Sequence, residues 1–295
     1  MPFDSTGKIS FDHIYTAPDP RPFFETLQRV DYQIPQLAKP YFTKLIEEFQ
    51  AERGIARPTV LDVGCSYGVN SALLRCETTL DDLYELYTAP GVEDLDRAAL
   101  LERDQRLVRS RATDDGARFY GLDAAGAALD YARSAGYLDE TIYADFERYD
   151  PDEAQQALLD QVDLVVSTGC VGYVTEKTIS RIARGSRPWM AHFVLRMFSY
   201  EPVAESLAEL GYETAAIDGV YRQRRFAGAE EQEHILDALD KAGVDPEGLE
   251  SEGWLYAQLY VSRPKKGAAA GLASALNAVS SEDTVSDDTA PDERG

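Results

Sequence analysis

The chain has 295 residues, of which 44% are apolar and 27% charged, enough for one sizeable hydrophobic core. Its formal net charge of −23 repels phosphate backbones, so nucleic acid is not expected as a partner. No apolar stretch reaches the about 18 residues that a membrane span needs, so we expect no membrane partner either.

The first residues, MPFDSTGKISFDH, lack the basic and apolar regions of a signal peptide. The three cysteines, Cys65, Cys76 and Cys170, are odd in number and scattered. This usage fits a reducing compartment, and the spacing is not that of metal ligands. We therefore expect a cytoplasmic protein and no metal site.

Residues 1–57 form the first predicted unit, a helical and aromatic segment. Aromatic side chains recur through it between prolines, and residues 38–53 have the apolar spacing of an amphipathic helix. Such a segment could close over a binding site as a lid, with Tyr15 as a candidate substrate contact. Packing of an irregular arm against a sheet edge explains the same pattern equally well.

Residues 59–74, TVLDVGCSYGVNSALL, combine a strand, a turn and a helix. The apolar run of Val60, Leu61 and Val63 indicates a buried strand, and helical spacing begins after Gly68. Between them lies Asp-x-Gly-x-x-x-Gly, which starts at Asp62. Glycines at a helix N-terminus allow a ligand to approach backbone N–H groups closely. The segment therefore predicts a ligand-binding loop.

Strand and helix patterns alternate through the rest of residues 58–264. Further strands are predicted at 119–122, 141–144, 162–167, 189–198, 212–217 and 254–261. Apolar strands alternating with helices predict an α/β fold: a Rossmann-like, seven-stranded, mostly parallel sheet with helices on both faces.

Two segments fall outside this alternation. Residues 78–116 are Leu-rich with helical period, and they separate the glycine loop from Asp123 by far more than the usual 20 or so residues. We interpret them as an inserted helical hairpin that forms a cap or a homo-oligomer contact. Residues 265–295 lack aromatic side chains and are rich in Ala, Ser and Asp, which predicts a disordered acidic tail.

The glycine loop resembles motif I of the class I S-adenosylmethionine-dependent methyltransferases, with Ser66 where a middle glycine often stands. The resemblance implies S-adenosyl-L-methionine (SAM) as cofactor and methyl transfer to a small molecule as the activity. The cofactor-binding residues that it implies are Asp62, Gly64, Cys65, Ser66, Gly68, Asp123, Ala124, Asp145, Phe146, Ser167 and Thr168.

Four successive strand ends carry these residues, in the order that the cofactor fold requires. By the resemblance, the glycine loop with Asp62 holds the methionine part, Asp123 the ribose, and Asp145 with Phe146 the adenine. Ser167 and Thr168 would line the path between methyl donor and acceptor. Ordinary alternatives exist: Asp123 can cap the next helix, and Asp145 can be a solvated loop carboxylate.

Two other functions must be weighed. Gly-Cys-Ser-Tyr-Gly also matches G-x-S-x-G, the nucleophile elbow of α/β-hydrolases, with Ser66 as nucleophile. That fold needs upstream strands, an oxyanion-hole loop and a histidine after the last strand, and none of these is apparent. A SAM-binding sensor or an inactive partner subunit would show the same loop.

Catalytic and substrate-binding residues are harder to predict. A general base is needed only if the acceptor is protonated, and the histidine candidates are His13 and His192, although His192 also fits a packed core position. Arg222 and Arg225 follow the sixth strand, and Arg196 shares a strand face with His192. Arginine forks suit carboxylates or phosphates, which suggests an anionic acceptor, but pairing with surface acids is an equal explanation.

Overall fold

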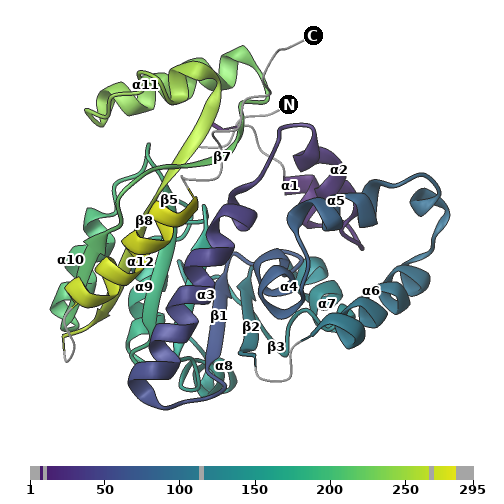
Figure 1. Cartoon of the computed structure of the whole chain (residues 1–295), viewed down its shortest axis with the longest axis horizontal. Helices are drawn as coiled ribbons and strands as arrows, with labels where there is room; N and C mark the ends of the chain where they lie inside the picture. The colour runs from purple at the N-terminus through teal and green to yellow at the C-terminus, as the bar shows by residue number, and fades with distance from the viewer. Residues whose placement is uncertain (1–6, 9–11, 113–115, 266–268, 284–295) are drawn as a thin grey trace, which may run out of the picture.

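A single mixed sheet forms the centre of the computed structural model, with helices on both of its faces (Figure 1). The structure describes residues 7–8, 12–112, 116–265 and 269–283. Within this part of the chain no helix is long and apolar enough to cross a membrane.

The strands are β1 (Thr59–Val63), β2 (Arg118–Asp123), β3 (Glu140–Tyr143), β4 (Leu164–Thr168), β5 (Trp189–Leu195), β6 (Tyr212–Ala216), β7 (Tyr221–Arg225) and β8 (Trp254–Pro264). The helices are α1 (Asp12–Tyr15), α2 (Arg21–Gln28), α3 (Ile34–Arg53), α4 (Val69–Arg75), α5 (Leu80–Thr88), α6 (Arg97–Arg111), α7 (Gly126–Ala135), α8 (Glu153–Leu159), α9 (Glu176–Ala183), α10 (Glu201–Glu209), α11 (Ala229–Lys241) and α12 (Ala269–Asp283). Two short 3-10 helices are η1 (Val92–Asp94) and η2 (Glu250–Glu252).

The strand order is β3-β2-β1-β4-β5-β8-β6, and β7 pairs with β8 off this path. Strands β1 to β5 run parallel, whereas β8 is antiparallel to β5, β6 and β7. The predicted Rossmann-like, mostly parallel sheet is confirmed. The eighth strand is β7, a polar Tyr-Arg-Gln-Arg-Arg segment that the apolar strand pattern did not reveal. The order reverses between β1 and β4, which is where such sheets bind ligands.

The core divides into a layer on each face of the sheet. On one face α3, α7 and α12 pack against side chains such as Phe119 and Phe193. On the other face α8, α9 and α10 pack against Leu61, Leu122 and Val165. Because helices cover both faces, β1 and β5 are buried along their whole length, and their sequences are accordingly mostly apolar.

Residues 78–112 of the predicted insertion add a helical layer beside α7, and residues 113–115 lie outside the described part. In this layer α5 packs against α2 of the N-terminal segment and α6 packs against α7. The fully buried Asp104 carboxylate accepts hydrogen bonds from the hydroxyls of Tyr87 (2.5 Å) and Tyr131 (2.6 Å), and Arg103 also donates to it. This cluster joins α5 and α6 to α7.

The expected disordered tail is wrong for residues 269–283, which form α12. This helix packs against α3 and β6, and Leu272 and Leu276 are buried in the main core. Ala and Ser make up most of this segment, yet two leucines four residues apart are enough to supply one apolar helix face. Residues 284–295 of the predicted tail lie outside the described part.

Docking of α12 makes Leu276 a stability determinant. Leu276→Ala is expected to lower the free energy of unfolding by about 2–4 kcal/mol, because it leaves a cavity between α12 and the sheet. Urea unfolding followed by circular dichroism measures this. The matched control is Ser274→Ala, at an exposed position of the same helix, which should have little effect. Equal stability of the two variants would mean that α12 is not docked and that the predicted disordered tail is correct.

Candidate functional site

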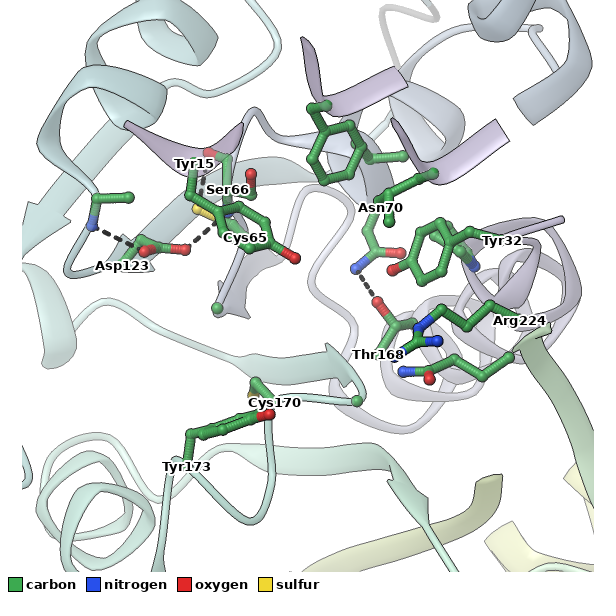
Figure 2. A pocket seen from close by; sticks show the side chains of 18 of the residues that line it. Tyr15, Tyr32, Cys65, Ser66, Asn70, Asp123, Thr168, Cys170, Tyr173 and Arg224 are labelled. Carbon is green, nitrogen blue, oxygen red and sulfur yellow. Dashed lines mark hydrogen bonds between the residues drawn. The ribbon is translucent and has the colours of Figure 1, made fainter. Parts of the chain in front are cut away.

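A cavity of about 530 Å³ lies at the carboxyl ends of β1, β2 and β4, where the strand order reverses. Figure 2 shows Ser66, Cys65 and Asp123 on one side of it and Thr168, Tyr32 and Arg224 on the other. Its lining comprises Lys8, Tyr15, Thr16, Phe23, Leu27, Tyr32, Pro35, Gly64, Cys65, Ser66, Val69, Asn70, Asp123, Ala124, Ala125, Thr168, Gly169, Cys170, Tyr173, Gln223 and Arg224.

In the loop between β1 and α4, the backbone at two positions requires glycine. Gly64 has φ of +69°, and a Cβ there would lie 2.7 Å from the Cβ of Cys170. Gly68 has φ of +74° and packs against α7, where a Cβ would lie 3.2 Å from the Cβ of Ala132. Ser66 also has positive φ (50°), and its buried Oγ has no hydrogen-bond partner within the described parts of the chain. The loop is thus tightly fixed, with an unpartnered hydroxyl at the cavity.

Asp123, at the end of β2, holds this loop. Its Oδ2 accepts the backbone N–H of Ser66 and its Oδ1 accepts that of Ala125, both at 2.8 Å (Figure 2). The second contact is a local turn before α7, and the helix-capping role that was the ordinary alternative is not seen, because the N-cap residue of α7 is Ala125 and it has no side-chain cap. A carboxylate has about four acceptor sites, so two backbone bonds leave capacity on each oxygen for a ligand in the cavity.

Asp62 lies directly behind the loop and is fully buried. Asn70 donates through Nδ2 to Asp62 Oδ1 and to Thr168 Oγ1, each at 3.1 Å. Asp62 Oδ2 has no partner in the described structure. Burial raises the pKa of Asp62 from 3.8 to about 7, against the lowering effect of the Asn70 hydrogen bond and with a smaller contribution from Asp123. A buried carboxyl without a cation is unusual and points to a site that receives positive charge.

The N-terminal segment forms one side of the cavity. Tyr15 and Thr16 line it at the end of α1, and Phe23 and Leu27 line it from α2. Tyr67, within the glycine loop, donates its hydroxyl to the carbonyls of Ile14 (2.8 Å) and Ala17 (2.9 Å). The loop and the segment that covers it are therefore directly joined.

Several predicted site residues meet at the cavity and others do not. Those that line it are Tyr15, Gly64, Cys65, Ser66, Asp123, Ala124 and Thr168. Asp62, Gly68 and Ser167 lie behind this lining. The placement of Asp145 and Phe146 in the site is not supported: Phe146 is only 3% exposed within the core, and Asp145 pairs with Arg148 at 3.4 Å. Strand ends were predicted well, but the direction of the side chains beyond β3 was not.

The two catalytic candidates lie away from the cavity. His13 is exposed on α1. His192 is fully buried in β5, where its Nδ1 lies 2.8 Å from Ser167 Oγ, and burial lowers its pKa to about 4. The packed core position, which was the alternative for His192, therefore describes it better than a catalytic role.

The three arginines expected to bind substrate contact other groups. Arg196 pairs with Glu250 at 2.6 Å. Arg225 pairs with Asp31 at 2.6 Å and lies over the Trp254 ring, which Arg222 also contacts. The substrate role is not supported for any of them.

Sequence reasoning missed the cavity residues contributed by β7, namely Gln223 and Arg224. Arg224 is buried in a two-bond pair with Glu231 of α11 (2.7 and 2.9 Å). Tyr32, Cys170 and Tyr173 were also missed. The sequence analysis selected the neighbouring Arg222 and Arg225 instead, because only the register of β7 decides which side chains of this strand line the cavity.

No family model matches this chain, and no curated protein matches it either. Solved structures with some resemblance include the plantazolicin methyltransferase BpumL in complex with a desmethyl substrate analogue and S-adenosylhomocysteine (SAH) (11% identity, 86% of this chain and 93% of that chain, TM-score 0.39). Another is a putative sarcosine dimethylglycine methyltransferase from Galdieria sulphuraria (15% identity, 75% of this chain and 84% of that chain, TM-score 0.38). A third is a TehB-like SAM-dependent methyltransferase from Corynebacterium glutamicum (13% identity, 72% of this chain and 84% of that chain, TM-score 0.36). Likenesses at this level do not fix a function.

The raised pKa of Asp62 predicts how stability depends on pH. The folded chain holds a proton on this carboxyl that the unfolded chain releases, so the contribution of Asp62 to stability falls as pH rises from about 4 to about 7. Asp62→Asn should therefore be more stable than the parent at pH 8, by on the order of 2 kcal/mol, and should lose this advantage towards pH 4. Thermal unfolding across this range measures the difference, and a constant difference would contradict the shifted pKa.

The Tyr67 hydroxyl predicts the local stability of the N-terminal segment. Tyr67→Phe removes the single hydroxyl proton that the carbonyls of Ile14 and Ala17 share, a hydrogen bond worth about 1 kcal/mol, and should speed amide exchange in residues 12–20 several-fold. Hydrogen exchange with mass spectrometry detects this. Tyr149→Phe, at an exposed tyrosine, is the control. Unchanged exchange in residues 12–20 would mean that ring packing alone holds the segment.

Proposed function

We propose that this chain is a SAM-dependent methyltransferase that transfers a methyl group to a small-molecule acceptor. The observation that carries the proposal is the convergence of Ser66, Asp123 and Thr168 from three strand ends on one cavity at the reversal of strand order. We also propose a cytoplasmic location, which the three cysteines, all free, support.

The residues present suit this cofactor. The Gly64 turn has no room for a Cβ, the Ser66 Oγ is buried without a partner, and Asp123 keeps acceptor capacity for the two hydroxyls of a ribose. The carboxyl of Asp62, with Oδ2 unpartnered, suits a nearby ammonium group. When bound, the cofactor would supply an electrophilic methyl group on a sulfonium sulfur.

The contribution of the chain is then to position the acceptor and exclude water. None of the three histidines, all of which lie in described parts of the chain, lines the cavity. Asp123 is the one carboxylate among the described lining residues, and it already accepts two backbone N–H groups. We therefore propose an acceptor whose reacting atom needs no general base from the protein.

The charge of the acceptor needs separate support. The arginines that suggested an anionic acceptor contact protein acids and aromatic rings away from the cavity. Of the cationic residues that do line it, Arg224 is paired with Glu231, and Lys8 lies 4.8 Å from the centre of the Tyr173 ring. A neutral acceptor suits this lining better than an anionic one.

The alternatives lack such support. A hydrolase would need a histidine beside Ser66, but none of the three described histidines lines the cavity, and the buried His192 is hydrogen-bonded to Ser167. A non-catalytic SAM sensor would bind the cofactor with the same residues. Turnover of SAM with any acceptor would show that the chain is an enzyme and not a sensor. The proposed oligomer through the 78–116 insertion stays a prediction.

Isothermal titration with SAM and with SAH tests the cofactor proposal. We expect micromolar binding, and Asp123→Ala should weaken it at least about tenfold, because the carboxylate both fixes the loop and faces the cavity. The matched control is Asp145→Ala, which removes the other strand-end aspartate and should leave the affinity within about twofold.

The outcomes of these titrations lead to different conclusions. Absence of binding to either ligand by the parent protein would reject the methyltransferase proposal. Binding that is weakened equally by both substitutions would mean that Asp145 reaches the ligand after all, as the sequence first suggested.

A further inference from the structure

Strand β7 has an irregular register that turns two consecutive side chains toward the cavity. Arg222 pairs with Tyr256 and Arg224 pairs with Leu255, so Gln223 is an extra residue against β8. In a regular strand neighbouring side chains alternate between faces, and a bulge changes their direction. Here both Gln223 and Arg224 are buried and line the cavity.

Gln223 is a buried polar residue of this wall. The residue is only 5% exposed, and its Oε1 has no hydrogen-bond partner among the residues that the structure describes. The amide nitrogen lies over Gly169, where a Cβ would come within 2.3 Å of it, so this position beside Thr168 requires glycine. Buried amides are normally satisfied, and one that faces a cavity without a partner indicates a ligand group.

The backbone around Gln223 is firmly held. Its carbonyl accepts the N–H of Gln33 at 2.9 Å, and the N–H of Arg225 donates to Val30 at 2.7 Å. Arg224 is fixed by its pair with Glu231, and Glu231 also accepts the N–H of Ala227. Because Arg224 is engaged in holding α11, Gln223 is the side chain of β7 that is left to recognise a ligand.

Flat aromatic and proline side chains line the cavity that Gln223 lines from β7. Tyr32 and Pro35 line the cavity from the segment that β7 contacts, Tyr173 from the loop after β4, and Tyr15 and Phe23 from the N-terminal segment. Such a lining accommodates planar molecules, because rings stack on aromatic faces. A carboxamide pairs best with a group that offers a donor beside an acceptor.

We infer that Gln223 determines acceptor specificity by pairing with an N–H and an adjacent carbonyl on a planar acceptor, the edge presented by a lactam ring. This inference rests on the proposed function, because it takes the acceptor to bind in the part of the cavity next to Thr168. Gln223 supplies recognition, and the neutral amide matches the neutral acceptor proposed above.

The test uses the full chain saturated with SAH and two probes, quinolin-2-one and 1-methylquinolin-2-one. The second probe keeps the ring and the carbonyl but lacks the N–H. We expect quinolin-2-one to bind at least about tenfold more tightly, by titration followed by NMR, because the methylated probe leaves the amide unpaired. Gln223→Met, which keeps the side-chain length, should bring the two affinities within about twofold of each other.

Two controls keep the outcomes distinct. Gln28→Met, at an exposed position of α2, should preserve the discrimination. SAH affinity measured for each variant verifies the fold and the cofactor site independently. If the parent protein fails to bind SAH, the proposed function fails first. If SAH binds, but the parent does not prefer quinolin-2-one or Gln223→Met keeps the preference, the inference about Gln223 is overturned.

Discussion

The Asp123 carboxylate connects β2 to the glycine loop, and the geometry of the cavity depends on this connection. One oxygen accepts Ser66 N–H and the other accepts Ala125 N–H, so the loop after β1 and the N-terminal end of α7 are held in one register. Ser66 adopts a positive φ that a non-glycine residue rarely takes, and this hydrogen bond helps to offset its cost. Without Asp123 the loop would lose the contact that fixes its unpartnered hydroxyl beside the cavity.

The helical layer outside the sheet has a related role. Helices α5 and α6 do not reach the cavity lining, but they support α1 and α2, which do. The Asp104 carboxylate and its tyrosine partners make this support rigid, because one oxygen of this buried acid accepts from Tyr87 of α5 and Tyr131 of α7, which resists separation of these helices from α6. The insertion therefore serves the cavity indirectly, by setting the position of the segment that covers it.

The sheet and the glycine loop were predictable from sequence, because both depend on local patterns: continuous apolar strands and glycines at a strand–helix junction. The residues that the family resemblance placed at the ends of β1, β2 and β4 include Ser66, Asp123 and Thr168, which line the cavity. The direction of the side chains after β3 was not predictable: Asp145 pairs with Arg148, and Phe146 is buried in the core. Gln223 was missed because a bulge breaks the alternation on which such reasoning depends. The docking of α12 depends on a face of α3 that no local pattern in residues 269–283 can reveal.

The pairing of residues 30–33 with β7 joins two parts of the chain that are nearly 200 positions apart. Strand β7 itself is held by β8, which inserts between β5 and β6. During synthesis from the N-terminus, the wall that β7 contributes to the cavity therefore forms only after β8 has left the ribosome. The opposite walls come from the first half of the chain, where Tyr32 already contacts Phe23, so the cavity is completed much later than the loop that it contains.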